Sequence, residues 1–306
     1  MKWTRVLMWL FLVAGLRAHA QGPNADELAK EANAAYESKD WDKTAKLYEK
    51  LSKQMTEPPP RVWLRFGAAL RSLGKYEEAL AAFEKAAQSG AGPFSEYGKA
   101  TVFAALKQLE KAFAALNSAV QQGYADPDAL LSEADLSALK SDARFAAIVE
   151  QAKKNQRPCA YAPENRQFDF WLGEWDVTTT QGEVPAGNSR IELILEDCVV
   201  QENWKSLNSP YAGKSYNIYN GALKRWEQYW VDNVGGNIFF YGGLKDGAMD
   251  YWTDELPQSD GTKLRRHLQF FKLGPDTVRQ FSQGSTDGGK TWRVEYDFTY
   301  RRKSKV

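Results

Sequence analysis

Catalytic chemistry in proteins most often uses histidines, cysteines and paired carboxyl groups, and this 306-residue chain has few of the first two. Its histidines are His19 and His267, and its cysteines are Cys159 and Cys198. Once a predicted leader that contains His19 is removed, a single histidine remains. That excludes a multi-histidine metal site and weakens any Ser–His–Asp or Cys–His arrangement. The spacing of the cysteines fits no zinc or redox motif, so we predict no metal site and no cofactor.

Carboxyl groups gather in the second half of the chain, as EWD at 174–176, ED at 196–197 and Glu202. A glycosidase needs two carboxyl groups that face each other about 5–10 Å apart. Adjacent residues of a strand point to opposite faces, so no neighbouring pair here meets that requirement, and only a pair formed across strands could. We predict no catalytic residue. An enzyme that uses carboxylates or tyrosines is kept as an alternative.

Aromatic side chains of the second half combine apolar faces with polar edges, which suits ligand binding. If the strands that carry them close into a barrel, its interior can hold a small molecule unless side chains fill it. Arginine and glutamine side chains would orient a polar head group if they point inward. The candidate ligand-binding residues are Trp204, Tyr229, Trp230, Tyr241, Arg266, Arg279 and Gln280. The alternative is a barrel filled by its own aromatic residues, which would act only as a rigid module.

Residues 1–20 have the pattern of a cleaved signal peptide. Lys2 and Arg5 begin it, an apolar run of 11 residues follows at 6–16, and AHA at 18–20 makes Gln21 the expected mature N-terminus. A membrane anchor is the alternative, but an 11-residue helix covers only about half of a hydrocarbon core of roughly 30 Å. No later segment is long and apolar enough to span a membrane. We expect export to a periplasm or secretion.

Export bears on both the charge and the cysteines. Removal of residues 1–20 takes away three basic residues and no acidic one, from totals of 40 Lys and Arg and 39 Asp and Glu. The remaining chain is close to neutral, which argues against a nucleic-acid partner. In an oxidising compartment Cys159 and Cys198 are expected to pair, closing a 40-residue loop worth about 4 kcal/mol. Two buried free thiols are the alternative.

The composition changes near residue 157. The part before it is rich in Ala, Leu, Glu and Lys, which favour helices, and the part after it is rich in aromatic residues, Val, Thr and Gly, which favour strands and turns. A chain of this length is expected to hold about two domains. We predict a helical domain at 25–155, a linker at 156–164 and a domain of strands at 165–302.

Three segments of the helical part are similar: KDWDKTAKLYEKL at 39–51, GKYEEALAAFEKA at 74–86 and KQLEKAFAALNSA at 107–119. Each has an equivalent small residue (Thr44, Ala79 and Ala112), with spacings of 35 and 33, and a large residue four positions later. A period near 34 built from two helices is typical of tetratricopeptide (TPR) repeats, and residues 25–124 resemble that family. Residues 128–155 are expected to form closing helices that cover the last repeat.

The TPR resemblance implies an α-solenoid in which the first helix of each repeat lines a concave groove for a protein partner. The groove candidates are Asn33, Tyr36, Arg61, Leu64, Arg71, Phe94 and Tyr97. The alternative is a structural spacer packed on the second domain.

The second half alternates apolar and polar residues, as in RVEYDFTY at 293–300, and turn sequences such as Asn220-Gly221 recur about every ten residues. This pattern predicts about eight to ten strands in an up-and-down order. A sheet of that size tends to close, because closure removes its unpaired edges. We therefore predict an antiparallel β-barrel.

The segments FDFWLGEWDV, ENWKS, GKSYNIYN, RWEQYWVD, VRQF and STDGGKTW, in this order, resemble a family of secreted lipocalin-like, calycin-type barrel domains that has no agreed activity. In calycin barrels the tryptophan of a Gly-x-Trp motif plugs the closed end, and an arginine of the last strand covers it. The resemblance implies these roles for Gly173, Trp175 and either Arg301 or Arg302.

Two further resemblances are local. Related barrels called nitrobindins bind haem through one histidine, but His267 lies in an alternating LRRHLQF stretch, where a packing or surface role is the simpler interpretation. STDGGKTW at 285–292 resembles the Asp-box of sialidases, which implies structural roles for Asp287 and Trp292 in a turn.

The sequence thus predicts an α-then-β protein, a TPR α-solenoid followed by an up-and-down barrel of the calycin or lipocalin-like type. The leading functional hypothesis is an exported, non-catalytic binding protein. Its repeats would dock a protein partner, and its barrel would hold a small apolar or amphipathic ligand. The alternatives are a hydrolase or isomerase and a purely structural interaction module.

Overall fold

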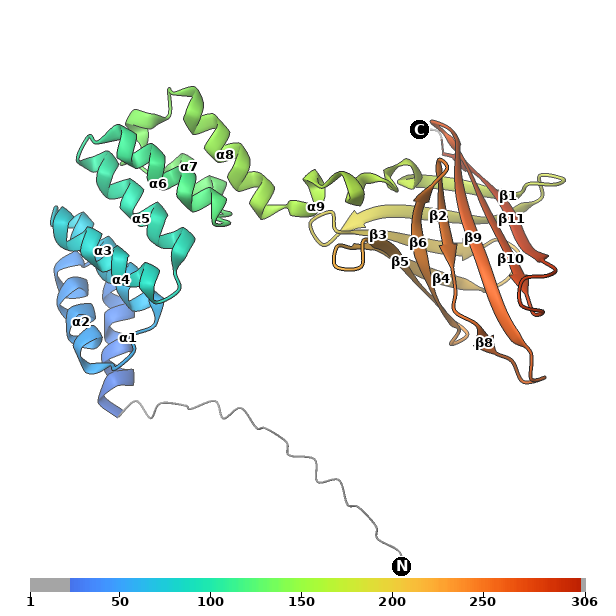
Figure 1. Ribbon diagram of the computed structural model, residues 1–306, viewed down its shortest axis with the longest axis horizontal. Helices are drawn as coiled ribbons and strands as arrows, with labels where there is room; N and C mark the ends of the chain where they lie inside the picture. The colour runs from blue at the N-terminus through green and yellow to red at the C-terminus, as the bar shows by residue number, and fades with distance from the viewer. Residues whose placement is uncertain (1–22, 304–306) are drawn as a thin grey trace, which may run out of the picture. The chain divides into compact units, whose positions relative to one another are not determined.

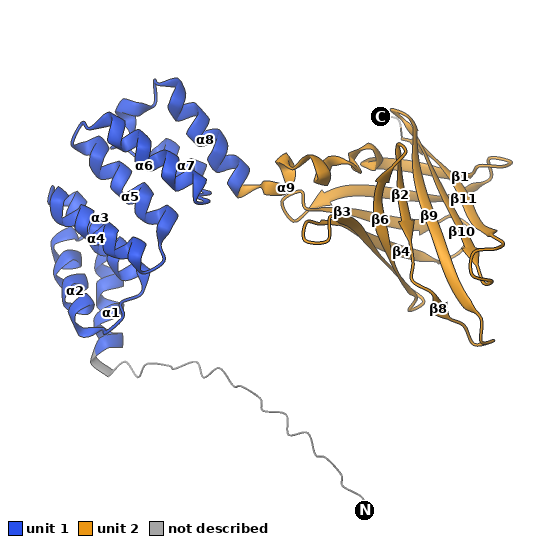
Figure 2. Ribbon diagram, in the orientation of Figure 1, with its two compact units in different colours: residues 1–155 blue, residues 156–306 orange. Residues whose placement is uncertain are grey.

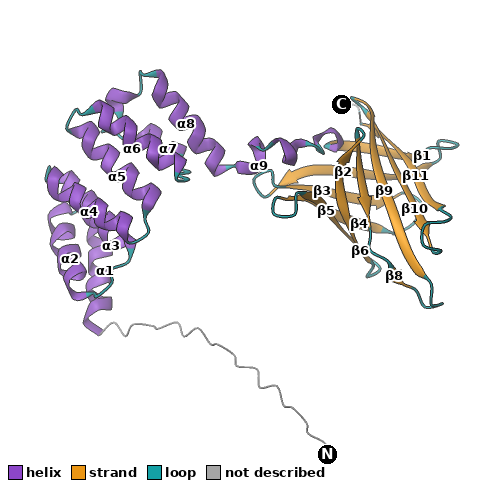
Figure 3. Cartoon of the chain, in the orientation of Figure 1, coloured by secondary structure: helices purple, strands orange, loops and turns teal. Residues whose placement is uncertain are grey.

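The computed structural model describes residues 23–303, so the predicted signal peptide and its cleavage site lie outside the described residues. The chain divides into two compact units, with the boundary between Asn155 and Gln156 (Figure 2). The first unit is helical, and the second consists mainly of strands (Figure 3). Within residues 23–303, no helix combines the length and the hydrophobicity needed to cross a bilayer.

Six helices of the first unit form three consecutive hairpins (Figure 1). Asp40 caps the second of them by accepting a hydrogen bond from the backbone N–H of Lys43, and Pro60 stands in the first turn of the third, where its missing N–H costs nothing. The pairs are α1 (Pro23–Glu37) with α2 (Trp41–Gln54), α3 (Pro60–Ser72) with α4 (Tyr76–Gln88), and α5 (Gly92–Ala105) with α6 (Leu109–Gln121).

The equivalent positions of the three predicted repeats are all buried. The small residues Thr44, Ala79 and Ala112 have no exposed surface, and the large residues Tyr48, Phe83 and Leu116 are at most 4% exposed. A Cβ atom on Gly98 of α5 would overlap the ring of Phe83 on α4. This glycine therefore permits the close packing of one hairpin on the next.

The closing segment consists of α7 (Pro127–Ser132), the 3₁₀ turn η1 (Ser137–Leu139) and α8 (Ala143–Gln156). Its apolar residues Leu130, Leu136, Leu139, Phe145, Ile148 and Val149 join one core with the last repeat. Leu131 of α7 is 49% exposed. The reason is that α7 has only six residues and buries one face.

The second unit is a closed antiparallel barrel of ten strands (Figure 1). Neighbouring strands follow the order of the chain, and β1 pairs with β11, which closes the ring. The two-residue β8 pairs only with the start of β9. The strands are β1 (Gly173–Thr179), β2 (Pro185–Ile194), β3 (Val199–Ser206), β4 (Ala212–Asn220), β5 (Arg225–Asp232), β6 (Asn237–Lys245), β7 (Ala248–Trp252), β8 (Leu256–Pro257), β9 (Lys263–Gly274), β10 (Thr277–Ser285) and β11 (Arg293–Arg302).

One end of the barrel is filled with aromatic side chains. Phe168, Trp171 and Trp175 are fully buried, and the indole N–H of Trp175 donates to the carbonyl oxygen of Trp171 at 2.9 Å. The guanidinium of Arg302 lies 4.3 Å from the centre of the Trp175 ring and donates to the carbonyl oxygen of Leu172. Of the two arginines that the resemblance allowed, Arg302 covers the indole.

Gly173 and Arg301 are the other two residues to which the resemblance gave a role at this end. Gly173 has φ of +130°, a backbone angle that favours glycine, and a Cβ atom there would displace the Arg302 guanidinium. Arg301 points away from the plug and pairs with Glu183 at the exposed surface.

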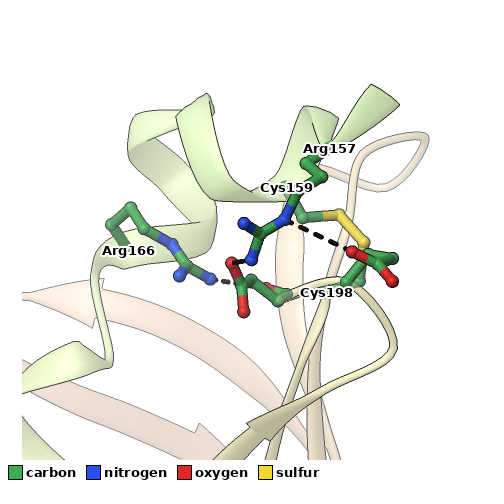
Figure 4. Close-up of a disulfide and its surroundings, with 6 residues drawn as sticks. Arg157, Cys159, Arg166 and Cys198 are labelled. Atoms are coloured by element: carbon green, nitrogen blue, oxygen red, sulfur yellow. Dashed lines mark hydrogen bonds and ion pairs between the residues drawn. A yellow bond between two sulfur atoms is a disulfide. The ribbon is translucent and has the colours of Figure 1, made fainter. Parts of the chain in front are cut away.

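The segment expected as a linker is attached to the barrel. It contains α9 (Pro158–Tyr161) and the 3₁₀ turn η2 (Pro163–Arg166), and the 3₁₀ turn η3 (Asp169–Trp171) follows. Cys159 of α9 forms a disulfide with Cys198, with 4.9 Å between their Cα atoms (Figure 4). Arg157 pairs with the carboxylates of Glu196 and Asp197, next to the second cysteine.

Candidate functional site

The barrel encloses a cavity of about 530 Å³ beyond the aromatic plug. Its wall is mostly apolar and aromatic, and its polar side chains include Glu202 and Gln280, which the Tyr300 hydroxyl links. The lining residues are Thr179, Ala186, Glu202, Trp204, Ser206, Asn208, Tyr211, Gln228, Trp230, Ile238, Phe240, Gln280, Glu295, Tyr296, Phe298 and Tyr300. This volume lies within the range of small-molecule sites.

Glu202 is the more buried of the two carboxyl groups that line this cavity, with 2% of its surface exposed. Ser189 donates a hydrogen bond to its Oε1 at 2.8 Å, and Ser215 donates to its Oε2 at 3.2 Å. Burial raises the pKa of Glu202 to about 7, although these hydroxyl groups favour the charged form. Glu202 therefore changes its charge near neutral pH.

A chain of side-chain amides fixes the direction of the hydrogen bonds at Glu202. Gln228 Nε2 donates to Asn217 Oδ1, and Asn217 Nδ2 donates to the Ser215 hydroxyl oxygen at 3.1 Å. Because that oxygen already accepts a hydrogen bond, the single hydroxyl proton of Ser215 is directed to Glu202. The network thus presents Glu202 with donors.

Tyr300 lies between Glu202 and Gln280. Its hydroxyl group is 3.3 Å from Glu202 Oε1 and 2.5 Å from Gln280 Oε1. A tyrosine has one hydroxyl proton, and the shorter contact takes it. Burial, followed by the charge of Glu202, raises the pKa of Tyr300 well above its ordinary value. Tyr300 therefore stays protonated while Glu202 titrates.

Glu295 is the second carboxyl group of the cavity, and its position corrects the predicted alternation of β11. The pairing of β10 with β11 shifts register between Ser282 and Gln283, so Glu295 has no direct partner across the ladder. This β-bulge turns Glu295 inward, although strict alternation placed it on the outer face. Its carboxylate accepts from Arg266 Nε at 2.8 Å and from Ser282 Oγ at 2.9 Å.

Four of the seven predicted ligand-binding residues have inward side chains. Trp204, Trp230 and Gln280 line the cavity. Arg266 lines an adjoining hollow of about 200 Å³, where it is bound to Glu295.

The other three are corrected, since the structure places them on the outer face. Tyr229 is 46% exposed, Tyr241 donates its hydroxyl proton to Asp254, and Arg279 pairs with Asp297. Each of them alternates with an inward neighbour on the same strand. Period two therefore puts the two sets on opposite faces.

Sequence reasoning noted Glu202 only as one of several carboxyl groups, and it missed Gln228, Tyr300 and Glu295 as site residues. A signal for Glu202 was present, because it precedes Trp204 by two positions and so shares its face of β3. Glu295 had no comparable signal, since its orientation depends on the bulge.

His267 points to the outer face of β9. Its ring stacks on Trp252 at 3.8 Å, and its Nε2 lies 2.8 Å from Asp250 Oδ2. Within residues 23–303, no group of three or more His, Cys, Asp or Glu side chains is arranged to hold a metal ion.

The Asp287 turn has the local hydrogen bonds expected of it. Asp287 accepts from the backbone N–H groups of Lys290 and Thr291 and from the hydroxyl of Thr291, which lowers its pKa. The indole N–H of Trp292 donates to the carbonyl oxygen of Gly289 at 3.2 Å.

Most of the predicted groove residues of the helical unit have side chains that contact other residues of the same unit. Asn33 Oδ1 accepts from Tyr48 and Arg65. Arg71 pairs with Glu133 and Asp135 of the closing segment. Of the remaining candidates, the side chains of Tyr36, Leu64 and Tyr97 are packed against neighbours, and those of Arg61 and Phe94 are exposed.

A hollow of about 500 Å³ lies elsewhere on this unit, between α2, α3 and α4. It is lined by Trp63, Phe66 and Met55 among others, and it includes none of the seven predicted groove residues.

These features define a protein that joins a helical repeat array to a barrel with an internal cavity, and the comparisons agree with the first part. The sequence profile of the tetratricopeptide repeat family matches residues 60–89. A search of curated proteins by sequence gives no match.

Three of the solved structures that resemble part of this chain are the following. The Yersinia enterocolitica type III secretion translocator chaperone SycD is 18% identical, over 44% of this chain and 96% of its own, with a TM-score of 0.32. PcrH in complex with the chaperone binding region of PopD is 23% identical, and the match covers 42% of this chain and 90% of PcrH, with a TM-score of 0.31. The TPR2B domain of yeast Sti1 in complex with pHsp70 is 23% identical, and the match covers 44% of this chain and 98% of that domain, with a TM-score of 0.32.

Proposed function

We propose that this protein is an exported, non-catalytic binding protein whose barrel holds a small amphipathic ligand and whose TPR array docks a protein partner. The observation that carries the proposal is the cavity, which combines aromatic walls with a polar group of side chains at one part of its lining. Sites for small molecules are typically concave, mostly apolar, and supplied with a few polar groups that orient the ligand.

The distribution of polarity supports an amphipathic ligand over a purely apolar one. Trp204, Trp230 and Phe298 would contact an apolar body, while Glu202 and Gln280 would contact a polar head. A ligand without polar atoms would leave Glu202 facing apolar surface, and an unpaired buried charge is costly.

The test of ligand binding uses the purified full-length protein. Organic extraction followed by mass spectrometry is expected to release a small molecule in stoichiometric amount. The variant Ser206→Trp places an indole inside the cavity and should carry none, because Ser206 lines the cavity wall. The matched control Lys205→Trp alters the adjacent outward residue of β3 and should keep the ligand. Equal recovery from both variants would place the molecule outside the barrel.

Partner docking by the TPR array is supported by the repeat match and by exposed side chains at two groove positions, Arg61 and Phe94. A photo-reactive amino acid at position 94 should cross-link one defined protein in the producing cells. The same residue at Lys50, exposed on α2, serves as the control. Identical cross-links from both positions would contradict docking through the predicted groove.

Export is proposed from the pattern at residues 1–20. The intact mass of the protein recovered from outside the cytoplasm should correspond to a chain that begins at Gln21. Recovery only from the cytoplasm, with Met1 or Lys2 at the N-terminus, would contradict it.

An enzyme is the second candidate, and Glu202 is the observation that favours it. A buried carboxyl group whose pKa is about 7 suits general acid–base catalysis, and Tyr300 beside it could assist a proton transfer. The two functions differ in what Glu202→Gln does to a molecule recovered by extraction. Binding predicts a changed affinity for an unaltered molecule, whereas catalysis predicts that the wild-type protein converts it and the variant does not.

A further inference from the structure

The charged groups around the cavity are more negative than positive. Among the residues that the structure describes, its lining includes two carboxyl groups and no lysine, arginine or histidine. Glu295 is neutralised by Arg266, whose Nε lies 2.8 Å from Glu295 Oε1. Among the described residues, the groups within hydrogen-bond distance of Glu202 include no cation: Ser189 and Ser215 donate to it, and the Tyr300 hydroxyl lies 3.3 Å away. The cavity therefore contains one carboxyl group without a compensating positive charge.

Glu202 also retains capacity to accept a hydrogen bond. An ionised carboxyl group offers about four acceptor positions, and the neighbouring hydroxyl groups use at most three of them. Since Glu202 is part of the cavity lining, the remaining position is available to a donor inside the cavity.

The wall beside Glu202 suits a positive charge as well. Trp204 and Trp230 line the same cavity, together with Tyr296 and Phe298. A cation over the face of a tryptophan ring is attracted by the ring electrons, and this attraction is stronger when water is excluded.

We propose that the barrel selects an organic cation, in which an ammonium group contacts Glu202 and an apolar body lies against Trp204 and Trp230. This inference rests on the proposed ligand-binding function and adds the charge of the ligand to it. An anionic ligand would meet Glu202 without any free cation to balance it, and a neutral ligand would leave that charge uncompensated.

The experiment compares three probes that share one apolar tail: octylammonium, octanol and octanoate. Titration calorimetry of the full-length protein at about pH 8, where most of Glu202 is ionised, should show octylammonium binding about tenfold or more tightly than octanol. Octanoate should bind most weakly. In the variant Glu202→Gln, octylammonium should bind no better than octanol, whereas Glu174→Gln, at an exposed position of β1, should behave as wild type.

A second readout does not depend on any variant. Near pH 7 part of the population carries a proton on Glu202, and a bound cation lowers its pKa, so binding should release protons. Octylammonium stays protonated at that pH, as a lysine side chain does, so the protons come from the protein. The binding enthalpy should therefore change with the ionisation enthalpy of the buffer.

The other titratable or charged groups at this part of the cavity are Tyr296 and Tyr300, which burial keeps protonated, and the Glu295–Arg266 pair. Glu295→Gln should leave the proton release in place, which assigns it to Glu202.

The outcomes separate this inference from the function on which it rests. Equal affinity for all three probes would overturn the charge preference and leave ligand binding intact. Tightest binding of octanoate would overturn it outright. If none of the probes binds, both proposals fall.

Discussion

Glu202 is the residue on which the proposed ligand preference of the cavity depends. Removing a carboxylate from water is unfavourable, and here only neutral hydroxyl donors offset that cost, which is why burial raises its pKa to about 7. The amide chain from Gln228 through Asn217 to Ser215 directs donors toward it. An apolar residue would fill this position of the barrel wall more stably, and the proposed binding function gives a reason for a carboxyl group there.

The pKa of Glu202 predicts a dependence of stability on pH. The folded-state pKa of about 7 exceeds the ordinary value of about 4.3, so the folded protein binds a proton that the unfolded chain releases. The stabilisation is complete below about pH 4, falls as pH rises toward 7, and levels off above it, with a total loss of about 4 kcal/mol.

Urea unfolding of wild type and Glu202→Gln between pH 4 and pH 9 measures this loss. The difference in free energy of unfolding between the two should shift in favour of the variant as pH rises. Glu174→Gln, at an exposed position, should keep the wild-type slope. A constant difference between wild type and Glu202→Gln across this range would contradict the raised pKa.

Arg302 and Arg301 offer a matched comparison of neighbouring residues. Arg302 covers the Trp175 indole, donates to Leu172 and pairs with Asp276, whereas Arg301 makes an exposed ion pair. Arg302→Ala should lower the free energy of unfolding of the barrel by about 1–3 kcal/mol. Arg301→Ala should change it by about 0.5 kcal/mol or less. Equal effects in chemical denaturation would show that the plug does not depend on Arg302.

At the scale of elements, the turn between β2 and β3 requires support from outside itself. Leu195, Glu196 and Asp197 have φ of 52°, 53° and 66°, and a left-handed conformation is unfavourable for residues other than glycine. The disulfide of Cys198, the ion pairs of Arg157, and a hydrogen bond from Arg166 to the carbonyl oxygen of Asp197 hold this turn against α9 and η2 (Figure 4). The short helices before the barrel are therefore part of its closed end.

Removal of this disulfide should destabilise the barrel. The loop that it closes spans a sequence separation of 39 residues, which the chain-entropy account values at about 4 kcal/mol. The double variant Cys159→Ser, Cys198→Ser should lose up to that amount in chemical denaturation. Dithiothreitol should bring the wild-type protein to the stability of the variant and leave the variant unchanged. A fully reduced wild-type protein of undiminished stability would contradict this role.

The helices and strands show what the sequence could and could not predict. Helices, repeat period and strand alternation follow from local patterns, and the repeat pattern picked out Ala79 and the large residue four positions later, Phe83, both of which are buried. Local patterns do not show which face of an aromatic-rich strand points into the barrel. Tyr229 and Trp230 are both amphipathic rings, and only pairing across the sheet shows that Trp230 is the inward one. Glu295 was out of reach because a bulge reverses its face.

At the scale of the whole molecule, the chain contains two independently cored parts. Within residues 23–303, each cluster of buried apolar residues lies on one side of the boundary between Asn155 and Gln156. A part with its own core is expected to unfold cooperatively by itself. The repeats and the barrel can then respond to different ligands.

This organisation predicts two thermal transitions, only one of which responds to a barrel ligand. Calorimetry of the full-length protein should show the transition of the barrel as the one that shifts downward in the Cys159→Ser, Cys198→Ser variant. Octylammonium at about one hundred times its Kd stabilises the protein by about 2.7 kcal/mol, which should raise that transition by roughly 5–10 °C for a unit of this size. The transition of the repeats should not move. Were octylammonium to shift both transitions together, or only that of the repeats, the cavity of the barrel would not be the site at which it binds.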